Sequence, residues 1–405
     1  MTATSSQVLT GAKRSDPHRL SPWCVPAFDY HSPTRVVFGA GTLARLGELA
    51  RELGGTRVLV VTDPGLWQAG HPQRAVEFLR AAGLEVCHFS EVEENPTSEH
   101  VEAGLKVARA GKIDLLVSVG GGSAMDCAKG INFLYTNGGQ ISDYKGFGKA
   151  ARPMLPSIGI PTTAGTGSEA QSYALIADAK THMKMACGDR KAAFWVAILD
   201  PELTVSQPAK VTAITGIDAL SHAAESYVTT KRNPLAQMFA REAWKMLDEN
   251  IETVLQTPTH LDARGNMQMG AFLAGTAIEN SMLGACHACA NPLTAHYGLT
   301  HGIAIGILLP HVVRFNASTV GSLYADLLAQ DNSLNGDEQA AGEILAERLI
   351  KLVRLAGLPQ RLSECGITDG ILPVLAEEAF QQWTARFNPR PVTEGDLLQL
   401  YKAAL

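Results

Sequence analysis

The fold is decided by the stretch IDLLVSVGGGSAMDCAK at residues 113–129. Its first seven residues form an apolar run typical of a buried parallel strand, and glycines follow before a helical pattern opens. Glycines let the backbone approach a pyrophosphate, and the first turn of the helix offers unpaired N–H groups and a positive dipole end. Met125 stands where the third glycine of the GxGxxG fingerprint would fall. The turn therefore predicts phosphate binding but departs from that fingerprint.

Apolar runs on both sides of this turn predict a doubly wound α/β layer. Short strand patterns, separated by helix-like segments, recur at residues 57–61, 84–89, 157–161 and 196–200. Alternating strands and helices are typical of a parallel sheet covered on both faces. We therefore expect an α/β domain over residues 28–205, preceded by a flexible tail at residues 1–27.

The second half of the chain has a different pattern. From Pro208 onward the β-branched runs nearly vanish, and Ala- and Leu-rich stretches of helical period replace them, for example at residues 338–356. This pattern predicts an all-helical domain over residues 206–405. The segment at residues 199–204 is the expected hinge between the two domains.

Composition excludes several classes of function. The chain has 405 residues, a formal net charge of −6 and scattered lysines and arginines, which argues against a nucleic-acid-binding surface. Its seven cysteines lack regular spacing, which favours a reducing cytoplasm over a disulfide scaffold. The polar N-terminus lacks the apolar core of a signal peptide, and no run of eighteen apolar residues predicts a membrane span.

Two further segments favour a dinucleotide. Asp63 follows the first strand, where a carboxylate accepts hydrogen bonds from a ribose hydroxyl and selects NAD. The segment PTTAGTGSE at residues 161–169 gathers small hydroxyl side chains around two glycines, which suits a loop lying against phosphate, ribose or nicotinamide. A lone aspartate is more often an ordinary turn residue, whereas so dense a hydroxyl cluster is harder to explain as a plain loop.

A carboxylate and an imidazole four residues apart, Asp218 and His222, share one face of a predicted helix and can reach one ion. His287 lies in a segment of small residues, and His301 lies fourteen residues later at a predicted turn. Spacing alone does not choose these histidines over His296 and His311. The pair Cys286 and Cys289 has no second CxxC, so we interpret it as buried thiols rather than half of a zinc site.

Taken together, these segments resemble the iron-dependent (group III) alcohol dehydrogenases from Phe28 to the C-terminus. The resemblance rests on six motifs in the order and spacing of that family. They are FGAG at 38–41, GGGSAMDCAK at 120–129, PTTAGTGSE at 161–169, GIDALSHAAESY at 216–227, LTHG at 299–302 and NPRP at 388–391. The implied fold class is an α/β N-terminal dinucleotide-binding domain plus an all-α C-terminal metal-binding domain, a dehydroquinate synthase-like architecture with the active site in the interdomain cleft.

The resemblance also implies roles for particular residues. It assigns the catalytic metal, Fe²⁺ or alternatively Zn²⁺, to Asp218, His222, His287 and His301. It assigns contacts with NAD to Asp63, Asn95, Gly121, Gly122, Ser123, Asp126, Thr162, Thr163, Thr166 and Ser168. Lys184 lies where relatives often carry a basic residue near the cofactor. The implied protein is a homodimer that transfers hydride between NAD(H) and a small primary or secondary alcohol, or its aldehyde or ketone.

The chain departs from the family at two positions. Relatives commonly have a second histidine four residues after the third ligand, and Asn291 stands there in this chain. Any proton transfer that this histidine assists must then use water or another side chain. Ala124 replaces a common proline after GGGS, a change that leaves phosphate binding intact.

Three other functions remain as alternatives. One is a same-fold specialist for an acidic substrate, such as a hydroxyacid transhydrogenase or a phosphonoaldehyde reductase, with Lys145, Lys149 or Arg390 as candidate cations. Another is a metal- and NAD-using lyase like dehydroquinate synthase, which needs a different ligand set. The last is a non-catalytic, metal-binding relative, which the intact motifs disfavour.

Overall fold

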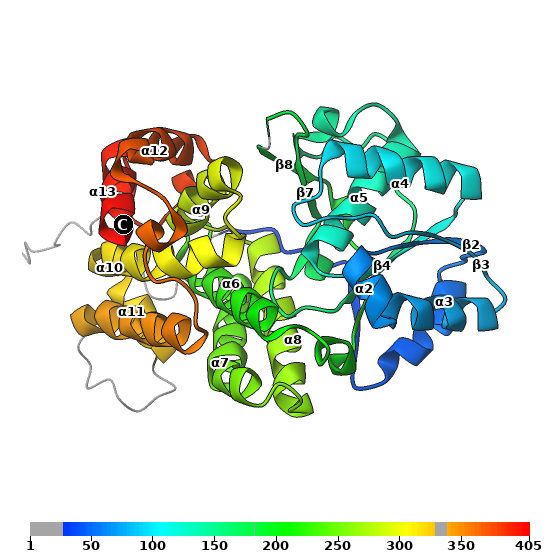
Figure 1. Cartoon of the computed structure of the whole chain (residues 1–405), viewed down its shortest axis with the longest axis horizontal. Coiled ribbons are helices and arrows are strands. Elements are labelled where there is room, and N and C mark those ends of the chain that lie inside the picture. The colour runs from blue at the N-terminus through cyan, green and yellow to red at the C-terminus, as the bar shows by residue number, and fades with distance from the viewer. Residues whose placement is uncertain (1–26, 182, 329–337) are drawn as a thin grey trace, which may run out of the picture.

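The computed structural model describes residues 27–181, 183–328 and 338–405. The expected tail at residues 1–27 falls almost wholly outside them. Figure 1 shows an α/β half built from the first part of the chain beside a helical half built from the rest. The predicted fold class is confirmed.

A six-stranded parallel sheet forms the centre of the first half, in the order β1-β9-β6-β4-β2-β3. Its strands are β1 (Arg35–Phe38), β2 (Arg57–Val61), β3 (Glu85–Phe89), β4 (Leu115–Gly120), β6 (Ser157–Pro161) and β9 (Val196–Leu199). All five predicted strands are present. The edge strand β1 was not predicted, because three of its four positions are exposed and it lacks the continuous apolar run of a strand buried on both faces.

Helices cover both faces of this sheet, as the continuous apolar strands require. On one face Leu59 and Leu116 pack into a core with α4 (Ser98–Gly111) and α5 (Gly122–Asn137). On the other face Val60 and its neighbours pack against two further helices. These are α1 (Leu46–Glu52) and α3 (His71–Ala81), and a short α2 (Pro64–Ala69) precedes α3.

A second, three-stranded sheet was missed by the sequence analysis. It consists of β5 (Gly146–Phe147), β8 (Lys184–Gly188) and β7 (Tyr173–Ala177), with β7 and β8 antiparallel. These strands carry mixed sequences such as KMACG, without a clear period of two. The sheet packs on α5 and supplies one wall of the cleft described below.

The helical half begins at α6, directly after Pro208, where the sequence pattern changes. Its helices are α6 (Ala209–Val228), α7 (Pro234–Gln256), α8 (Leu261–Glu279), α9 (Ala285–Tyr297), α10 (His301–Leu328), α11 (Glu338–Leu355), α12 (Leu372–Gln381) and α13 (Glu394–Ala404). Helix α10 has the length and composition of a membrane span, but most of it is buried in the common core. It is therefore a core helix of the helical half.

Close contacts fix the two halves to each other. The connection predicted as a hinge is a tight turn at Pro201–Thr204. It is anchored to the first half, because the carboxylate of Asp200 accepts hydrogen bonds from the backbone N–H groups of Gly41 and Leu43 at 3.1 and 3.0 Å. The loop at residues 161–169 lies directly on α8, because a Cβ added at Gly275 would come within 2.4 Å of the Gly167 carbonyl oxygen.

Candidate functional site

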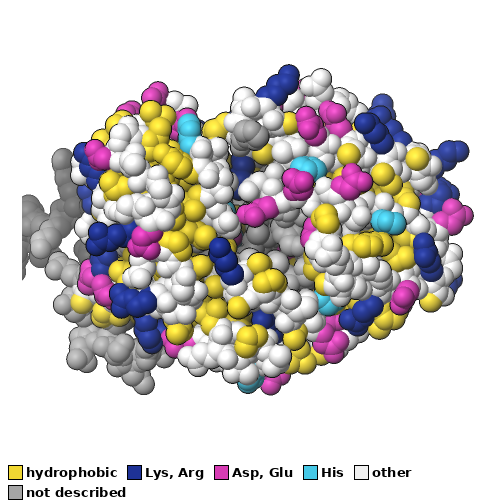
Figure 2. All heavy atoms as spheres, viewed as in Figure 1, with side chains coloured by type: hydrophobic (Ala, Val, Ile, Leu, Met, Phe, Trp, Pro, Cys, Tyr) yellow, Lys and Arg dark blue, Asp and Glu magenta, His cyan; other side chains and the backbone are white. Residues whose placement is uncertain are grey.

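A cleft of about 1550 Å³ runs between the two halves and is lined by residues of both. Figure 2 shows that this face of the molecule is hollowed where the halves meet. Each predicted metal ligand and each predicted cofactor-binding residue lines the cleft. The structure therefore brings together segments that are up to 238 positions apart in the chain, from Asp63 to His301.

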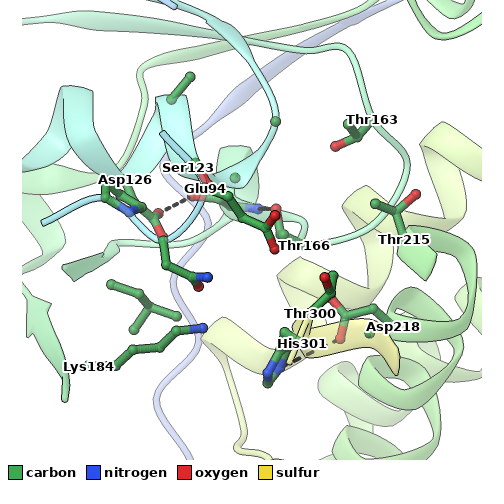
Figure 3. Close-up of a pocket in the computed structure, with 18 of the residues that line it drawn as sticks. Glu94, Ser123, Asp126, Thr163, Thr166, Lys184, Thr215, Asp218, Thr300 and His301 are labelled. Carbon is green, nitrogen blue, oxygen red and sulfur yellow. Dashed lines mark hydrogen bonds and ion pairs between the residues drawn. The ribbon is translucent and has the colours of Figure 1, made fainter. Parts of the chain in front are cut away.

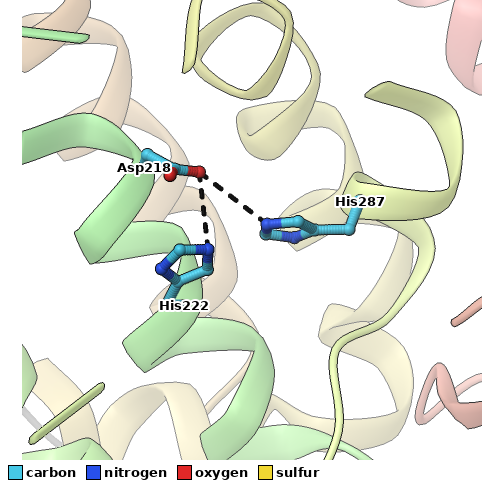
Figure 4. Close-up of side chains that lie close together, drawn as sticks. All are labelled: Asp218, His222 and His287. Carbon is cyan, nitrogen blue, oxygen red and sulfur yellow. Dashed lines mark ion pairs between the residues drawn. The ribbon is translucent and has the colours of Figure 1, made fainter. Parts of the chain in front are cut away.

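Four of these side chains converge at the helical wall of the cleft. Asp218 and His222 lie one turn apart on α6, while His287 comes from the first turn of α9 and His301 begins α10. The Asp218 Oδ1 atom lies 3.5, 3.7 and 3.8 Å from the Nε2 atoms of His222, His287 and His301. Figures 3 and 4 show these side chains pointing toward one another.

This cluster fits a transition metal. Ligands bonded at about 2.1 Å in a tetrahedral arrangement lie about 3.4 Å apart, close to the separations from Asp218. The Asp218 Oδ1 and His287 Nε2 atoms are buried without a hydrogen-bond partner among the described residues. Buried polar atoms are normally paired, so donor atoms left free at a common point indicate ligands of an ion. The potential ligand atoms of Asp218, His222 and His287 all lie within 4.8 Å of one another, and His301 falls outside this tight group.

The pKa values of the four clustered side chains shift in different directions. Burial raises the pKa of Asp218, but the facing imidazoles outweigh burial and hold that pKa well below its usual range. Burial lowers the pKa of His287, yet Asp218 and Glu225 outweigh burial and raise that pKa to about 9. Burial lowers the pKa values of His222 and His301, so their rings stay neutral and free to bind an ion.

The phosphate turn lies at the carboxyl edge of the parallel sheet. Strands β2, β4 and β6 are neighbours, so Asp63, the turn at residues 121–123 and the loop at residues 161–169 meet at one edge. Ligands of open α/β sheets bind at this edge. Helix α5 begins at Gly122, and its open N-terminal turn faces the cleft. Figure 3 shows Ser123, Thr163 and Thr166 around this region.

Gly122 has a packing role as well. A Cβ at this position would lie 2.6 Å from Thr166 Cγ2. The missing side chain therefore lets the threonine loop approach the start of α5.

Other predicted cofactor residues have protein partners of their own. The Asp63 carboxylate accepts a hydrogen bond from the Leu66 backbone N–H at 2.9 Å and so caps α2. The Ser168 hydroxyl donates to Asp126 at 2.7 Å. Beneath them the Lys129 ammonium donates to the Ser168 carbonyl and hydroxyl at 2.7 and 2.9 Å.

Lys129 was missed by the sequence analysis. It is three residues after Asp126 on α5, a spacing that places both side chains on one helical face.

The cations considered for an acidic substrate have different positions. Lys145 lines the cleft, whereas Lys149 and Arg390 do not. Arg390 instead stacks over Phe315, with 3.9 Å between the guanidinium and the ring centroid. Lys184 also lines the cleft, extending from β8 toward His301 (Figure 3), and burial lowers its pKa.

The positions of His296, His311 and the two cysteines show whether each lies near the ligand set. His296 pairs with Glu378 at 2.9 Å, and His311 lies on α10 outside the cleft lining. Cys286 and Cys289 are fully buried free thiols, as predicted. Asn291 lines the cleft and donates a hydrogen bond to Gln382 at 3.2 Å.

Comparison with known proteins gives consistent matches over nearly the whole chain. The family model described as iron-containing alcohol dehydrogenase matches residues 33–201, and that of the Fe-containing alcohol dehydrogenase C-terminal region matches residues 212–405. The NAD-dependent methanol dehydrogenase of Bacillus methanolicus is 35% identical over 379 residues, covering 93% of this chain and 100% of that protein. The 1,3-propanediol dehydrogenase of Klebsiella pneumoniae is 35% identical over 381 residues, covering 93% and 98%.

Solved structures match in the same way. The crystal structure of a 1,3-propanediol oxidoreductase superposes with a TM-score of 0.91 at 34% identity, covering 94% of this chain and 100% of that one. An alcohol dehydrogenase from Oenococcus oeni superposes with a TM-score of 0.90 at 30% identity, covering 94% and 100%.

Proposed function

The chain belongs to the iron-containing alcohol dehydrogenase family, and from this premise we propose that it transfers hydride between NAD(H) and a small primary or secondary alcohol, or the corresponding aldehyde or ketone. One observation carries the proposal. A set of one carboxylate and three imidazoles, buried except for the partly exposed His301, shares a single cleft with an open helix N-terminus and a hydroxyl-rich loop.

Asp218, His222, His287 and His301 are the proposed ligands of the catalytic ion. Nitrogen and carboxylate ligands suit both Fe²⁺ and Zn²⁺; the family favours Fe²⁺, and Zn²⁺ is the alternative. When bound, the ion supplies Lewis acidity for a substrate oxygen. The protein holds the ligand set rigid, because all four side chains come from helices of one packed core.

The dinucleotide is proposed to lie along the sheet edge. Backbone N–H groups of the turn at residues 121–123 would bind its phosphates, and the loop at residues 162–168 would orient the nicotinamide half toward the ligand set. Asp63 and Asn95 also line the cleft. We propose NAD rather than NADP, since the Asp63 charge repels a 2′-phosphate.

Neutral alcohols are the proposed substrate class. Of the cations predicted for an acidic substrate, Lys149 and Arg390 do not line the cleft, whose lysines are Lys145, Lys184 and Lys210. Relatives named for methanol and 1,3-propanediol are each 35% identical to this chain, and we propose that its preferred alcohol is likewise small and uncharged. A homodimer in the cytoplasm is the expected physiological form, and the free thiols of the described cysteines suit that compartment.

The proposal is tested by NADH production from a panel of alcohols, using protein stripped of metal and reloaded anaerobically with Fe²⁺ or Zn²⁺. We expect His287→Ala to lose metal and activity together while still binding NADH. His296→Ala is the matched control, because His296 lies on the same helix but pairs with Glu378 outside the ligand set. Full activity of His287→Ala after chelation would show that the metal assignment is wrong.

A further inference from the structure

We propose that Glu225 is a positioning residue for the ligand set: it holds the His287 ring so that Nε2 faces Asp218 and the ion. The inference rests on the proposed function, because it concerns how the proposed ligands are oriented. Glu225 lies within the motif GIDALSHAAESY, and its place in that motif alone indicates no role for it.

The contacts of Glu225 are short and fully enclosed. One carboxylate oxygen, Oε2, lies 2.5 Å from His287 Nδ1, and the other, Oε1, accepts the Cys286 backbone N–H at 2.8 Å. The residue is only 4% exposed. Glu225 therefore contacts the His287 ring and the backbone of the preceding residue, Cys286, both away from solvent.

The position of Glu225 on α6 explains how one helix organises the site. Asp218, His222 and Glu225 are spaced by four and three residues, so they lie on one helical face. Two of them are proposed ligands, and the third meets His287 across the gap between α6 and α9. One face of one helix thus sets the positions of three of the four ligands.

The chemistry requires an acceptor at this place. An ionised carboxylate only accepts hydrogen bonds, so it requires His287 to carry its proton on Nδ1 and leaves the Nε2 lone pair for an ion. The Nε2 atom lies 3.7 Å from Asp218 Oδ1 and has no hydrogen-bond partner in the part of the chain that the structure describes. Metal-binding histidines commonly depend on such a partner on the far nitrogen.

A purely structural role is the competing interpretation, because Glu225 also caps α9. The first N–H groups of a helix lack internal partners, and here Glu225 accepts from Cys286 while Asn388 accepts from Ala285 at 3.2 Å. A Cβ at Gly284 would lie 3.0 Å from Glu225 Oε1 and 2.9 Å from Asn388 Oδ1, so the absence of a side chain there gives both caps room to approach. An experiment must therefore separate helix capping from ring orientation.

Glu225→Gln makes that separation. Glutamine keeps an oxygen for the Cys286 N–H, but its amide nitrogen then faces His287 Nδ1 and requires that atom to accept. The ring proton moves to Nε2, the atom that the ion needs. Glu279→Gln is the matched control, because Glu279 also accepts one backbone N–H and one side-chain donor, both from Ser172 at 2.9 and 2.5 Å, outside the cleft lining.

The readouts are the dissociation constant and visible absorption spectrum of Co²⁺ added to the metal-free full-length protein, together with the thermal midpoint of the metal-free form. We expect Glu225→Gln to bind Co²⁺ about 10 to 100-fold more weakly, with an altered absorption band. Its metal-free midpoint should fall no further than that of Glu279→Gln. Glu225→Asp, which keeps the carboxylate, should recover part of the affinity.

The outcomes are distinct. Wild-type protein that binds no Co²⁺, or that binds it unchanged in His287→Ala, overturns the proposed function and this inference with it. Wild-type binding that Glu225→Gln matches within about threefold, with the same spectrum, overturns the inference alone. Should Glu225→Gln fail to fold, Glu225→Asp decides: weaker Co²⁺ binding at an unchanged metal-free midpoint supports the inference, and unchanged binding overturns it.

Discussion

At the scale of single residues, the proposed metal site is a balance between burial and charge. Three imidazoles face one carboxylate in a place where each charged form costs desolvation free energy. His287 differs from the other two rings because a second carboxylate, Glu225, contacts its Nδ1 atom at 2.5 Å. The cluster therefore contains one ring that is easily protonated and two that are not.

This difference predicts how metal affinity depends on pH. With a pKa raised to about 9, the metal-free His287 ring carries an extra proton below that pH, and this proton must leave before Nε2 binds an ion. Each unit of pH decrease should then weaken binding about tenfold. His222 and His301, whose pKa values burial lowers, add no such dependence above neutral pH.

The measurement is competition for Co²⁺ with a chelator of known affinity at each pH from 7 to 9. Affinity should rise steadily with pH across this range and level off only above about pH 9. His296→Ala should follow the wild-type curve. A flat profile over this range would contradict the protonation of His287.

Asp63 gives a second prediction at this scale. Its carboxylate caps α2 and lines the cleft, so Asp63→Ser keeps a good N-cap while it removes the charge. We expect kcat/KM with NADP to rise at least about fivefold relative to NAD, the size of one charge interaction near 4 Å. Asp63→Ala, which also removes the cap, is the comparison for stability. An unchanged NAD to NADP ratio in both variants would remove Asp63 from cofactor selection.

Individual site residues were predictable from sequence to different degrees. Helical spacing alone placed Asp218 and His222 on one face, whereas His287 and His301 followed only from the resemblance to a family. Glu225 has the same spacing signal as the two ligands on α6, but nothing local shows that it meets a residue 62 positions later. Pairing between distant segments is a property of packing that single-sequence periodicity does not contain.

At the scale of elements, the sheet edge determines where the cofactor residues meet. The order β6-β4-β2 places three loops side by side although they are far apart in sequence. The apolar strands were predicted because burial on both faces leaves a continuous run of apolar residues. The edge strand β1 and the small sheet β5-β8-β7 were not, since short, mixed strands are stabilised by their neighbours rather than by their own pattern.

The turn at the start of α5 gives the prediction for this scale. Gly122→Ala would place a Cβ 2.6 Å from Thr166 Cγ2 and push the threonine loop away from the helix. Overpacking of this kind costs about 1 to 3 kcal/mol, so NADH affinity should fall at least about fivefold while Co²⁺ affinity stays constant. Both are measured by titration.

Gly370→Ala is the control for Gly122→Ala, because no atom lies within 4 Å of its added Cβ. Equal NADH affinity of Gly122→Ala and wild type would contradict the prediction. It would mean that the threonine loop can shift to accommodate the added Cβ without weakening cofactor binding.

At the scale of the whole molecule, the site depends on how the two halves are joined. The Gln268 side chain donates to the Pro161 carbonyl oxygen at 2.9 Å, and Gly167 lies against Gly275 without room for a Cβ. The loop that would orient the nicotinamide is thereby fixed to helix α8 of the other half. The sequence predicted two halves and a cleft, but not this junction, because it joins residues about 100 positions apart.

The proposed metal ligands and the proposed cofactor residues come from different halves, and this separation predicts the effect of metal removal. All four proposed ligands come from helices α6, α9 and α10, while the proposed cofactor residues all precede Pro208. An ion at 1,000 times its dissociation constant stabilises the native state by about 4.1 kcal/mol. Stripping it should lower the thermal midpoint and abolish activity, yet leave NADH affinity within about threefold of that of the loaded protein.

Calorimetry of stripped and reloaded protein, with NADH titrations on the same samples, checks this prediction. His287→Ala is the matched control, because added metal should not raise its midpoint. An equal rise in wild type and His287→Ala would place the stabilising ion elsewhere. Loss of NADH binding on stripping would contradict the prediction. It would show that the ion also helps to bind the cofactor, although the two sets of residues come from different halves of the chain.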